Sequence, residues 1–176
     1  MNLETKRLYL RDYKKTDWET VYEYTSVPDF SKYEMWGPNT LEDTKKFINE
    51  LIRKSEVKPR FQFELAVCLK QTRQQIGGCG IRRVTESSNV ANLGWTMNPL
   101  FQNKGFTTEG AAKLIEFGFN ELNLNVIYAT CDTRNITSYK VMEKLKMKKV
   151  GHMIGDRKID NQIFNSYRYE ILKTDY

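Results

Sequence analysis

The sequence predicts one α/β (α+β) domain over residues 1–176, and three observations support this. The chain of 176 residues has the length of a single domain, and 40% of its residues are hydrophobic. In some segments apolar residues recur every three or four positions, as on one face of a helix. In others they alternate with polar residues, as in a strand. No internal repeat, linker or low-complexity tract divides these segments.

The first third of the chain predicts a strand followed by two helices. Residues 3–11 form the opening strand. Thr16 with Glu19, and Thr40 with Asp43, have the spacing of a capping box, and apolar residues at helical intervals follow each pair. The segment between the helices, residues 26–38, contains two prolines and several aromatic residues. This loop either packs over the core or forms one wall of a substrate pocket.

The middle and the end of the chain predict antiparallel strands. Alternation is clearest from Phe61 to Leu69, and the other strands expected are residues 76–83, 90–97, 148–154 and 166–172. Gly77, Gly78 and Gly80 weaken a regular strand and indicate a bulge or a close backbone contact. The last two strands form a hairpin with a polar connection at residues 156–161.

Residues 98–109 precede a helical apolar pattern that runs from Ala111 to Leu122. Backbone N–H groups at a helix N-terminus lack partners, and the helix dipole favours an anion there. Gly105 allows close backbone approach and Lys104 adds positive charge, which together suit a pyrophosphate. An ordinary glycine-containing loop before an amphipathic helix is the alternative interpretation.

A second strand, loop and helix follow this one. They are expected at residues 126–131, 132–138 and 139–146. The loop contains Asn135 and Ser138, either of which a helix start could use as a cap. Two strand-loop-helix units in succession therefore bring two polar loops into the same region of the chain.

Two motifs stand in these loops. They are Gln102-x-x-Gly105-x-Thr107 and Asn135-x-x-Ser138-x-x-x-Met142-Glu143-Lys144-Leu145. Three further landmarks agree with them, namely residues 3–11 followed by Asp17, residues 76–81, and Asn98-Pro99. Together these segments resemble the GNAT acetyltransferase superfamily, specifically its RimJ/RimL-type branch, over nearly the whole chain.

The resemblance implies a single GNAT-like domain whose central mixed, mostly antiparallel sheet is flanked by helices on both faces. It also implies acetyl-CoA as cosubstrate, without a metal. The backbone of Trp95, Thr96 and Met97 would pair with the pantetheine arm as an added strand does. Asn135 would bond to the same arm, and Ser138 would face the thioester sulfur. The residues implied at the pyrophosphate are Gln102, Asn103, Lys104, Gly105, Phe106 and Thr107.

The implied reaction is direct transfer of an acetyl group to a primary amine. The amine must be neutral, the oxyanion needs hydrogen-bond donors, and the leaving thiolate gains from a proton. The backbone N–H near Met97 is the candidate oxyanion donor, and Ser138 is the candidate catalytic partner of the sulfur. The resemblance favours the loop at residues 26–38, called the aromatic loop below, as one wall of the acceptor pocket. Glu34 and Trp36 are its substrate-binding candidates.

Four positions depart from the family pattern. Thr107 stands where Gly or Ala is usual, Met142 where many members have a tyrosine, and Lys146 where a glycine usually follows the second helix. Asn92 occupies the place of a glutamate that commonly acts as base, and an amide cannot take that proton. The general base is therefore unassigned, with Glu34 as one substitute.

Composition excludes several classes of protein. No segment approaches the roughly 18 consecutive apolar residues of a membrane span, and no signal-like apolar stretch opens the chain, so a cytoplasmic protein is expected. The net charge is only +6 and lacks an aromatic-interleaved basic patch, which argues against nucleic acid as a partner. Cys68, Cys79 and Cys131 have no metal-binding spacing and are expected to be reduced.

Several functions stay open at this point. An acetyl-CoA-dependent N-acetyltransferase for a peptide or protein N-terminal α-amine comes first. An enzyme for a small amine, such as a polyamine or an aminoglycoside, comes second. A non-catalytic module that binds acetyl-CoA, and a basic nucleic-acid-binding protein, belong to other classes. A homodimer also stays open.

Overall fold

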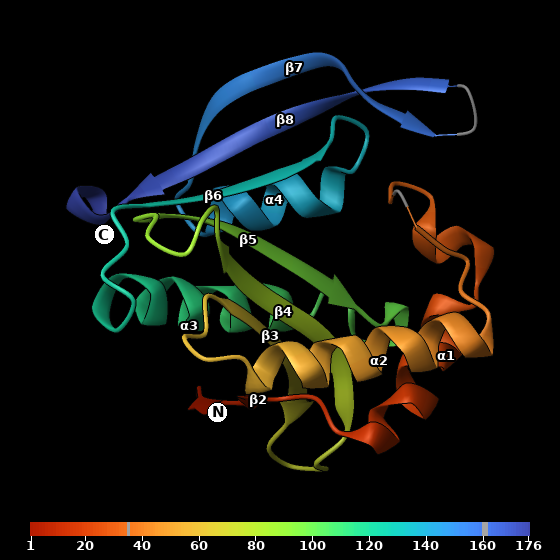
Figure 1. Cartoon of the computed structure of the whole chain (residues 1–176). Helices are drawn as coiled ribbons and strands as arrows, with labels where there is room; N and C mark the ends of the chain where they lie inside the picture. Colours follow the sequence, from red (N-terminus) through yellow and green to blue (C-terminus); the bar gives the residue numbers. More distant parts are fainter. Residues whose placement is uncertain (35, 160–161) are drawn as a thin grey trace.

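A computed structural model describes residues 1–34, 36–159 and 162–176. In these residues, eight strands form one sheet with helices on both of its faces (Figure 1). The strands are β1 (Asn2–Glu4), β2 (Leu8–Arg11), β3 (Gln62–Leu69), β4 (Gln75–Arg83), β5 (Val90–Met97), β6 (Val126–Asp132), β7 (Lys148–Ile159) and β8 (Gln162–Leu172). The helices are α1 (Trp18–Thr25), α2 (Leu41–Glu56), α3 (Phe106–Asn120) and α4 (Ile136–Lys144). Short 3-10 helices are η1 (Lys15–Asp17), η2 (Pro28–Ser31), η3 (Pro99–Phe101) and η4 (Lys173–Asp175). The predicted mixed, mostly antiparallel fold is confirmed.

The strand order is β1-β2-β3-β4-β5-β6-β8-β7. Among the described strands β5 and β6 form the only parallel pair, and this pairing is short: it joins Val90–Asn92 to Val126–Tyr128. Beyond these residues β5 continues to Met97 and β6 continues to Asp132, but the two strands no longer pair with each other and they diverge (Figure 1). The sheet is therefore open along the C-terminal half of β5.

Apolar side chains are buried on both faces of the sheet. One cluster lies under α3 and α4 and includes Leu65, Ile81 and Phe119. The other lies under α1 and α2 and includes Ile48 and Ala66. Because β3 and β4 are covered on both sides, most of their residues are buried, which accounts for their near-continuous apolar and glycine sequence.

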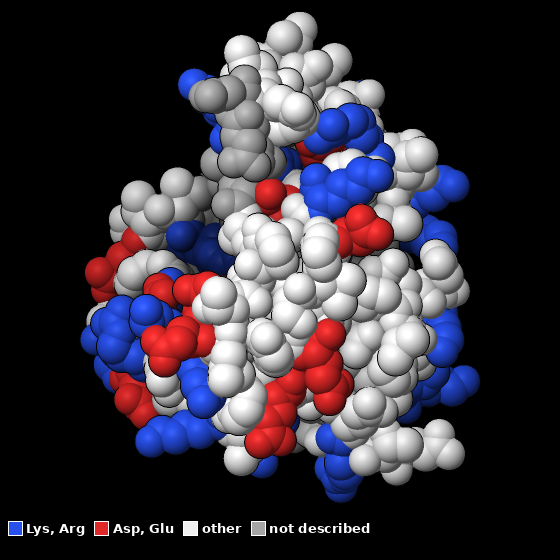
Figure 2. All heavy atoms as spheres, turned by 90° about the vertical axis from the view of Figure 1, so that its right-hand side faces the viewer, with Lys and Arg blue, Asp and Glu red and all other residues white. Residues whose placement is uncertain are grey.

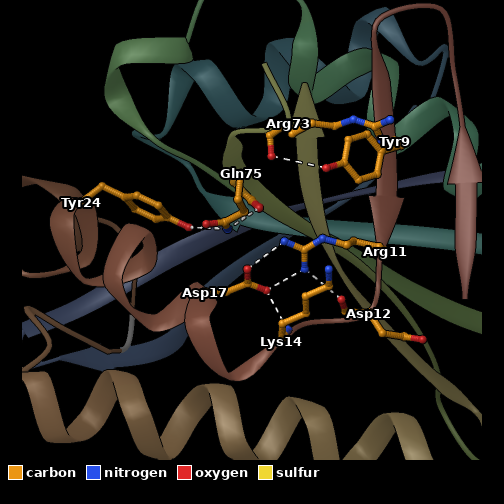
Figure 3. Close-up of polar contacts among 9 residues, drawn as sticks. Tyr9, Arg11, Asp12, Lys14, Asp17, Tyr24, Arg73 and Gln75 are labelled. Atoms are coloured by element: carbon orange, nitrogen blue, oxygen red, sulfur yellow. Dashed lines mark hydrogen bonds and ion pairs between the residues drawn. The ribbon is translucent and has the colours of Figure 1, made fainter. Parts of the chain in front are cut away.

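The start of α1 is held by a buried carboxylate (Figure 3). Asp17 accepts hydrogen bonds from both terminal nitrogens of Arg11 at 2.7 and 2.8 Å and from the Lys14 backbone N–H at 2.7 Å. The expected Thr16–Glu19 capping box does not form, because Asp17 caps the preceding η1 turn instead. The expected Thr40–Asp43 box is confirmed, with reciprocal bonds of 3.1 Å.

Several element boundaries differ from the sequence-based expectations. The opening strand is broken into β1 and β2 at a turn in which the Thr5 N–H bonds to the Leu8 carbonyl at 2.9 Å. α3 begins at Phe106 and α4 at Ile136, each earlier than its apolar pattern, because the first turns carry polar residues. A bulge does accompany the glycines of β4, between Val67 and Cys68 of the partner strand.

The C-terminal hairpin is longer than expected. β7 reaches Ile159 and β8 starts at Gln162, so most of the expected polar connection at 156–161 belongs to a strand. Positions 160 and 161 lie outside the described residues. The pairing has a register shift between Met153 and Arg157, where Gly155 adopts φ 67°. This irregularity lets polar residues continue the strand pairing.

Replacing Asp17 with alanine tests the anchor of α1. The change leaves the largely buried Arg11 guanidinium without its carboxylate, so the free energy of unfolding should fall by about 3 kcal/mol. Glu19→Ala removes the same charge from an exposed site on the next turn and should cost less than about 0.5 kcal/mol. Urea denaturation of both variants measures the difference, and equal losses would contradict the assignment.

Candidate functional site

The divergence of β5 from β6 leaves a cleft of about 620 Å³ between the end of β5, the start of α3 and α4. Ten of the residues predicted to bind the cosubstrate line it, namely Trp95, Thr96, Met97, Gln102, Asn103, Gly105, Phe106, Thr107, Asn135 and Ser138. The structure thus brings together two loops that lie thirty residues apart in the sequence.

The edge of β5 that faces this cleft carries free backbone groups. The Asn98 N–H donates to the Ile76 carbonyl of β4 at 2.9 Å. Backbone groups alternate between the two edges of a strand, so Thr96 also faces β4, whereas the N–H groups of Trp95 and Met97 face the cleft. An extended ligand can therefore hydrogen-bond to this edge as an added strand would.

The loop before α3 presents a second set of donors. Asn103 has φ 60° and the N-cap residue Gly105 has φ 78°, so the chain turns sharply into the helix. The Glu109 N–H donates to the Gly105 carbonyl at 3.0 Å, which makes it the first N–H bonded within the helix. The N–H groups of Phe106 and Thr107 precede it and stay available to an anion. This cradle fits a pyrophosphate.

The N-terminal turn braces the same loop from outside. The Glu109 carboxylate accepts from the Thr5 hydroxyl at 2.6 Å, the Arg7 N–H at 2.8 Å and the Arg7 Nε at 2.6 Å. Burial would raise the pKa of Glu109, but these bonds hold it below its usual range. Arg7 also donates to the Lys104 carbonyl at 3.0 Å. No local sequence pattern indicates this role for Arg7 and Glu109, because the contact between them spans about a hundred residues.

Lys104 is the one predicted cofactor residue whose side chain does not line the cleft. Its ammonium folds back and donates to the Leu100 carbonyl at 3.0 Å, over the ring of Phe101. Lys104 therefore contributes to the shape of the loop. The positive end of α3, together with Lys140 and Lys144 of α4, supplies the positive charge that faces the cleft.

A second cavity of about 510 Å³ adjoins the cleft on the α1 and α2 side of the sheet. Its floor is the backbone of Gly78, Gly80 and Gly94, which lie side by side on neighbouring strands. A Cβ atom at Gly78 would collide with the Tyr13 hydroxyl, and one at Gly80 with the Glu64 carboxylate. A Cβ atom at Gly77 would lie 2.5 Å from the Thr96 carbonyl oxygen, so the close contact predicted for Gly77, Gly78 and Gly80 is confirmed. The absence of side chains at Gly78, Gly80 and Gly94 leaves room for the cavity.

An ion pair lies across the glycine floor. Arg82 donates to the Glu64 carboxylate at 2.9 Å and to the Asn92 amide oxygen at 3.0 Å. Asn92, at the position where a glutamate base is usual in the family pattern, is thus a neutral acceptor for Arg82. Neither Glu64 nor Arg82 was expected from the sequence, since each lies in an ordinary strand pattern.

Glu34 lies where the two cavities meet, together with Tyr33, Thr96 and Ser138, each of which lines both. Burial raises the pKa of Glu34, the positive charge of Arg157 opposes the shift, and the nearby Asp132 adds to it. Trp36 lines the second cavity but not the cleft, and it packs on Phe30 with ring centroids 5.8 Å apart. The aromatic loop is therefore a cavity wall, as one of its two interpretations predicted; Met35 lies outside the described residues.

Asn135 and Ser138 meet at the start of α4. The Asn135 side-chain oxygen accepts from the Ser138 N–H at 3.1 Å, so this asparagine caps the helix. Burial raises the pKa of the neighbouring Cys131 thiol to about 11 despite a hydrogen bond with Ser138. Cys131 therefore stays protonated near neutral pH and is a poor nucleophile.

The remaining departures concern packing and conformation. Met142 is the buried residue of α4, and Lys146 adopts φ 60°, a conformation that suits the glycine usual there. The described residues contain no group of three or more His, Cys, Asp or Glu that could hold a metal ion. They also contain no helix long and apolar enough to cross a membrane. On the face shown in Figure 2, acidic and basic side chains are interspersed.

Comparisons with known proteins agree with this geometry. A model of the acetyltransferase (GNAT) domain matches residues 7–148. The chain is 36% identical over 176 residues to the uncharacterized N-acetyltransferase YnaD of Bacillus subtilis, covering 100% of this chain and 99% of the relative. It is 30% identical to the uncharacterized N-acetyltransferase p20 of Bacillus licheniformis, in an alignment that covers 99% of this chain and 97% of that relative. A crystal structure of a GNAT-family acetyltransferase from Bacillus anthracis matches with a TM-score of 0.90 at 32% identity, covering 99% of each chain. The chain belongs to the GNAT family of N-acetyltransferases.

Proposed function

We propose that this enzyme transfers the acetyl group of acetyl-CoA directly to a primary amine, with the α-amine of a peptide or protein N-terminus as the first candidate. The observation that carries the proposal is the meeting of two cavities at Glu34, Ser138 and the end of β5. The RimJ/RimL-type motifs favour the peptide α-amine. We call the second cavity, on the α1 and α2 side of the sheet, the acceptor cavity. A small amine is the second candidate, because this cavity is also lined by acidic side chains such as Glu34 and Asp132.

Acetyl-CoA, when bound, supplies an acetyl thioester whose carbonyl carbon forms a bond to the amine nitrogen as the carbon–sulfur bond breaks. The open edge of β5 at Trp95 and Met97 holds the pantetheine arm as an added strand. The N–H groups at the start of α3, with Asn103 and Gly105, hold the pyrophosphate. Asn135 shapes the opposite wall by fixing the first turn of α4.

Three groups at the meeting point have the chemistry that acyl transfer needs. The Met97 N–H stabilises the negative charge that develops on the carbonyl oxygen. The Glu34 carboxylate takes the proton that the amine loses, and its raised pKa makes it a better proton acceptor than an exposed glutamate. The Ser138 hydroxyl donates to the departing sulfur. No covalent acetyl-enzyme is needed.

The first test is thiol release from acetyl-CoA by the purified protein with N-terminal peptides, polyamines and aminoglycosides. Acetylated product, identified by mass spectrometry, is expected, and an acetylated peptide would assign the first acceptor class. Acetylated polyamine or aminoglycoside would instead assign the second acceptor class. Binding of acetyl-CoA without any product above background hydrolysis would contradict catalysis and favour a non-catalytic binding module.

Gly105→Asp tests the pyrophosphate cradle. The new carboxylate lies against the pyrophosphate and competes for the helix N–H groups, so affinity for acetyl-CoA should fall about 10- to 100-fold by calorimetry. Gly155→Asp is the matched control, because Gly155 also has positive φ but lies in the hairpin, away from the cleft. Unchanged affinity in Gly105→Asp would rule out the cradle.

Glu34→Gln tests the assignment of the general base. The amide cannot take a proton, so kcat/KM should fall about 100-fold. In the unaltered enzyme kcat/KM should decline as pH falls through the raised pKa of Glu34, because protonation removes the base; this decline should vanish in the variant. Glu42→Gln, at an exposed position on α2, should leave both rate and pH profile unchanged. An unaltered profile in Glu34→Gln would exclude it as the base.

A further inference from the structure

The acceptor cavity contains an arginine that the proposed chemistry does not use. Arg157 lies on β7, opposite Phe164 of β8, and its side chain reaches the aromatic loop, where it donates to the Tyr33 carbonyl. It lines the same cavity as Glu34 and Asp132. Arg157 is half-buried, so its positive charge is held close to the point where the acetyl group is transferred.

The buried carboxylate of this cavity that lies nearest in the chain to the strand of Arg157, Asp132, is already paired with another arginine. Asp132, which is 1% exposed, forms a bidentate pair with Arg134 at 2.8 and 2.9 Å. Among the described residues no carboxylate forms an ion pair with Arg157. A guanidinium has five N–H donors, and the Tyr33 carbonyl takes one of them. The other donors stay available to a ligand that enters the cavity.

The second guanidinium in the cavity differs in this respect. Arg82 donates to both Glu64 and Asn92, so its fork is occupied by partners from two neighbouring strands. An incoming anion would have to displace Glu64 to reach it. Of the two guanidinium groups that line the described part of the cavity, Arg157 is therefore the one with hydrogen-bond donors left for an acceptor.

Glu34 supplies the complementary charge beside it. Arg157 lowers the pKa of Glu34 against the effect of burial, which means that the two charges interact across the cavity. A ligand that satisfies both carries an amine and an anionic group close together. A diamine would direct a second cation towards Arg157, and a peptide would offer it only a neutral carbonyl.

We infer that Arg157 binds the α-carboxylate of the acceptor, with its amine at Glu34, and that free α-amino acids are the acceptor class. A planar guanidinium binds a carboxylate through two parallel hydrogen bonds, which a lysine cannot reproduce. Val21, Phe47 and Leu51 line the cavity and favour an apolar side chain. This inference rests on the proposed acetyl transfer, and it replaces the peptide N-terminus with the free amino acid as the acceptor.

Three acceptors with one side chain test the inference: leucine, leucinamide and 3-methylbutylamine, with a second series built on phenylalanine. The unaltered enzyme should have its highest kcat/KM with the amino acids. Arg157→Gln should lower that value about 10- to 100-fold more than the value for the simple amines, the range expected for a lost charged hydrogen bond. A smaller loss shared by all acceptors is expected, because Arg157 also bonds to the Tyr33 carbonyl and lowers the pKa of Glu34. The kcat/KM of Arg157→Lys with the amino acids should lie between the values of the unaltered enzyme and of Arg157→Gln.

Lys158→Gln is the matched control. It removes the same charge from the next residue of β7, which is exposed and does not line the cavity, and it should not alter the order of the three acceptors. An equal loss for all three acceptors in Arg157→Gln would overturn the inference, because it would mean that Arg157 only positions the aromatic loop. Preference of the unaltered enzyme for the amides would also overturn it, in favour of peptides.

Calorimetry with leucine and phenylalanine separates this inference from the proposed function. If no acceptor is acetylated, the proposed transfer fails, but binding of the amino acids by the unaltered protein and its loss in Arg157→Gln would still support the role of Arg157. Equal binding by both proteins, or no binding to either, would overturn it. The two failures therefore give different results.

Discussion

The short pairing between β5 and β6 is the constraint on which the rest of the molecule depends. Three residue pairs join the two strands before they separate, and the whole site is built in the opening that results. If the ladder continued, the N–H groups of Trp95 and Met97 would be used within the sheet. The separation also lets the cleft and the acceptor cavity meet, because both open on the same end of β5.

Polar contacts over long sequence distances fix the two sides of this opening. Arg11 and Asp17 hold α1 against the sheet, and so position the helical wall of the acceptor cavity. On the other side Arg7 ties the N-terminal turn to Glu109 and to the loop before α3. A buried ion pair such as Arg11–Asp17 gives little net stability, but losing one partner is costly, so this contact specifies where α1 lies.

Much of the fold could be predicted from the sequence because its signals are local. The alternation from Phe61 to Leu69 and the capping box at Thr40 depend on neighbours within a few residues, and both predictions are confirmed. The prediction of a Thr16–Glu19 capping box is wrong because Asp17, the next residue after Thr16, forms an ion pair with Arg11. Such competition between a local motif and a partner from another strand cannot be read from spacing alone.

The candidate site shows the same limit. The cleft is lined by two continuous loops and the end of β5, so most of its lining residues could be named in advance; Lys104 is the exception, because its side chain turns away. The acceptor side is assembled from separate elements. Glu64, Arg82 and Arg157 carry no local signal, because a charged residue in a strand usually faces solvent. Only the folded arrangement shows that they share one cavity.

The glycine floor gives the two halves of the site different freedom to change. Gly78, Gly80 and Gly94 set the depth of the acceptor cavity, while its rim is made by the aromatic loop and the C-terminal hairpin. The loop and the hairpin lie at the periphery, outside the strands that hold the open edge of β5. Substitutions in the rim, apart from Glu34, can therefore reshape the second cavity while the glycine floor and the cleft beside β5 stay unchanged.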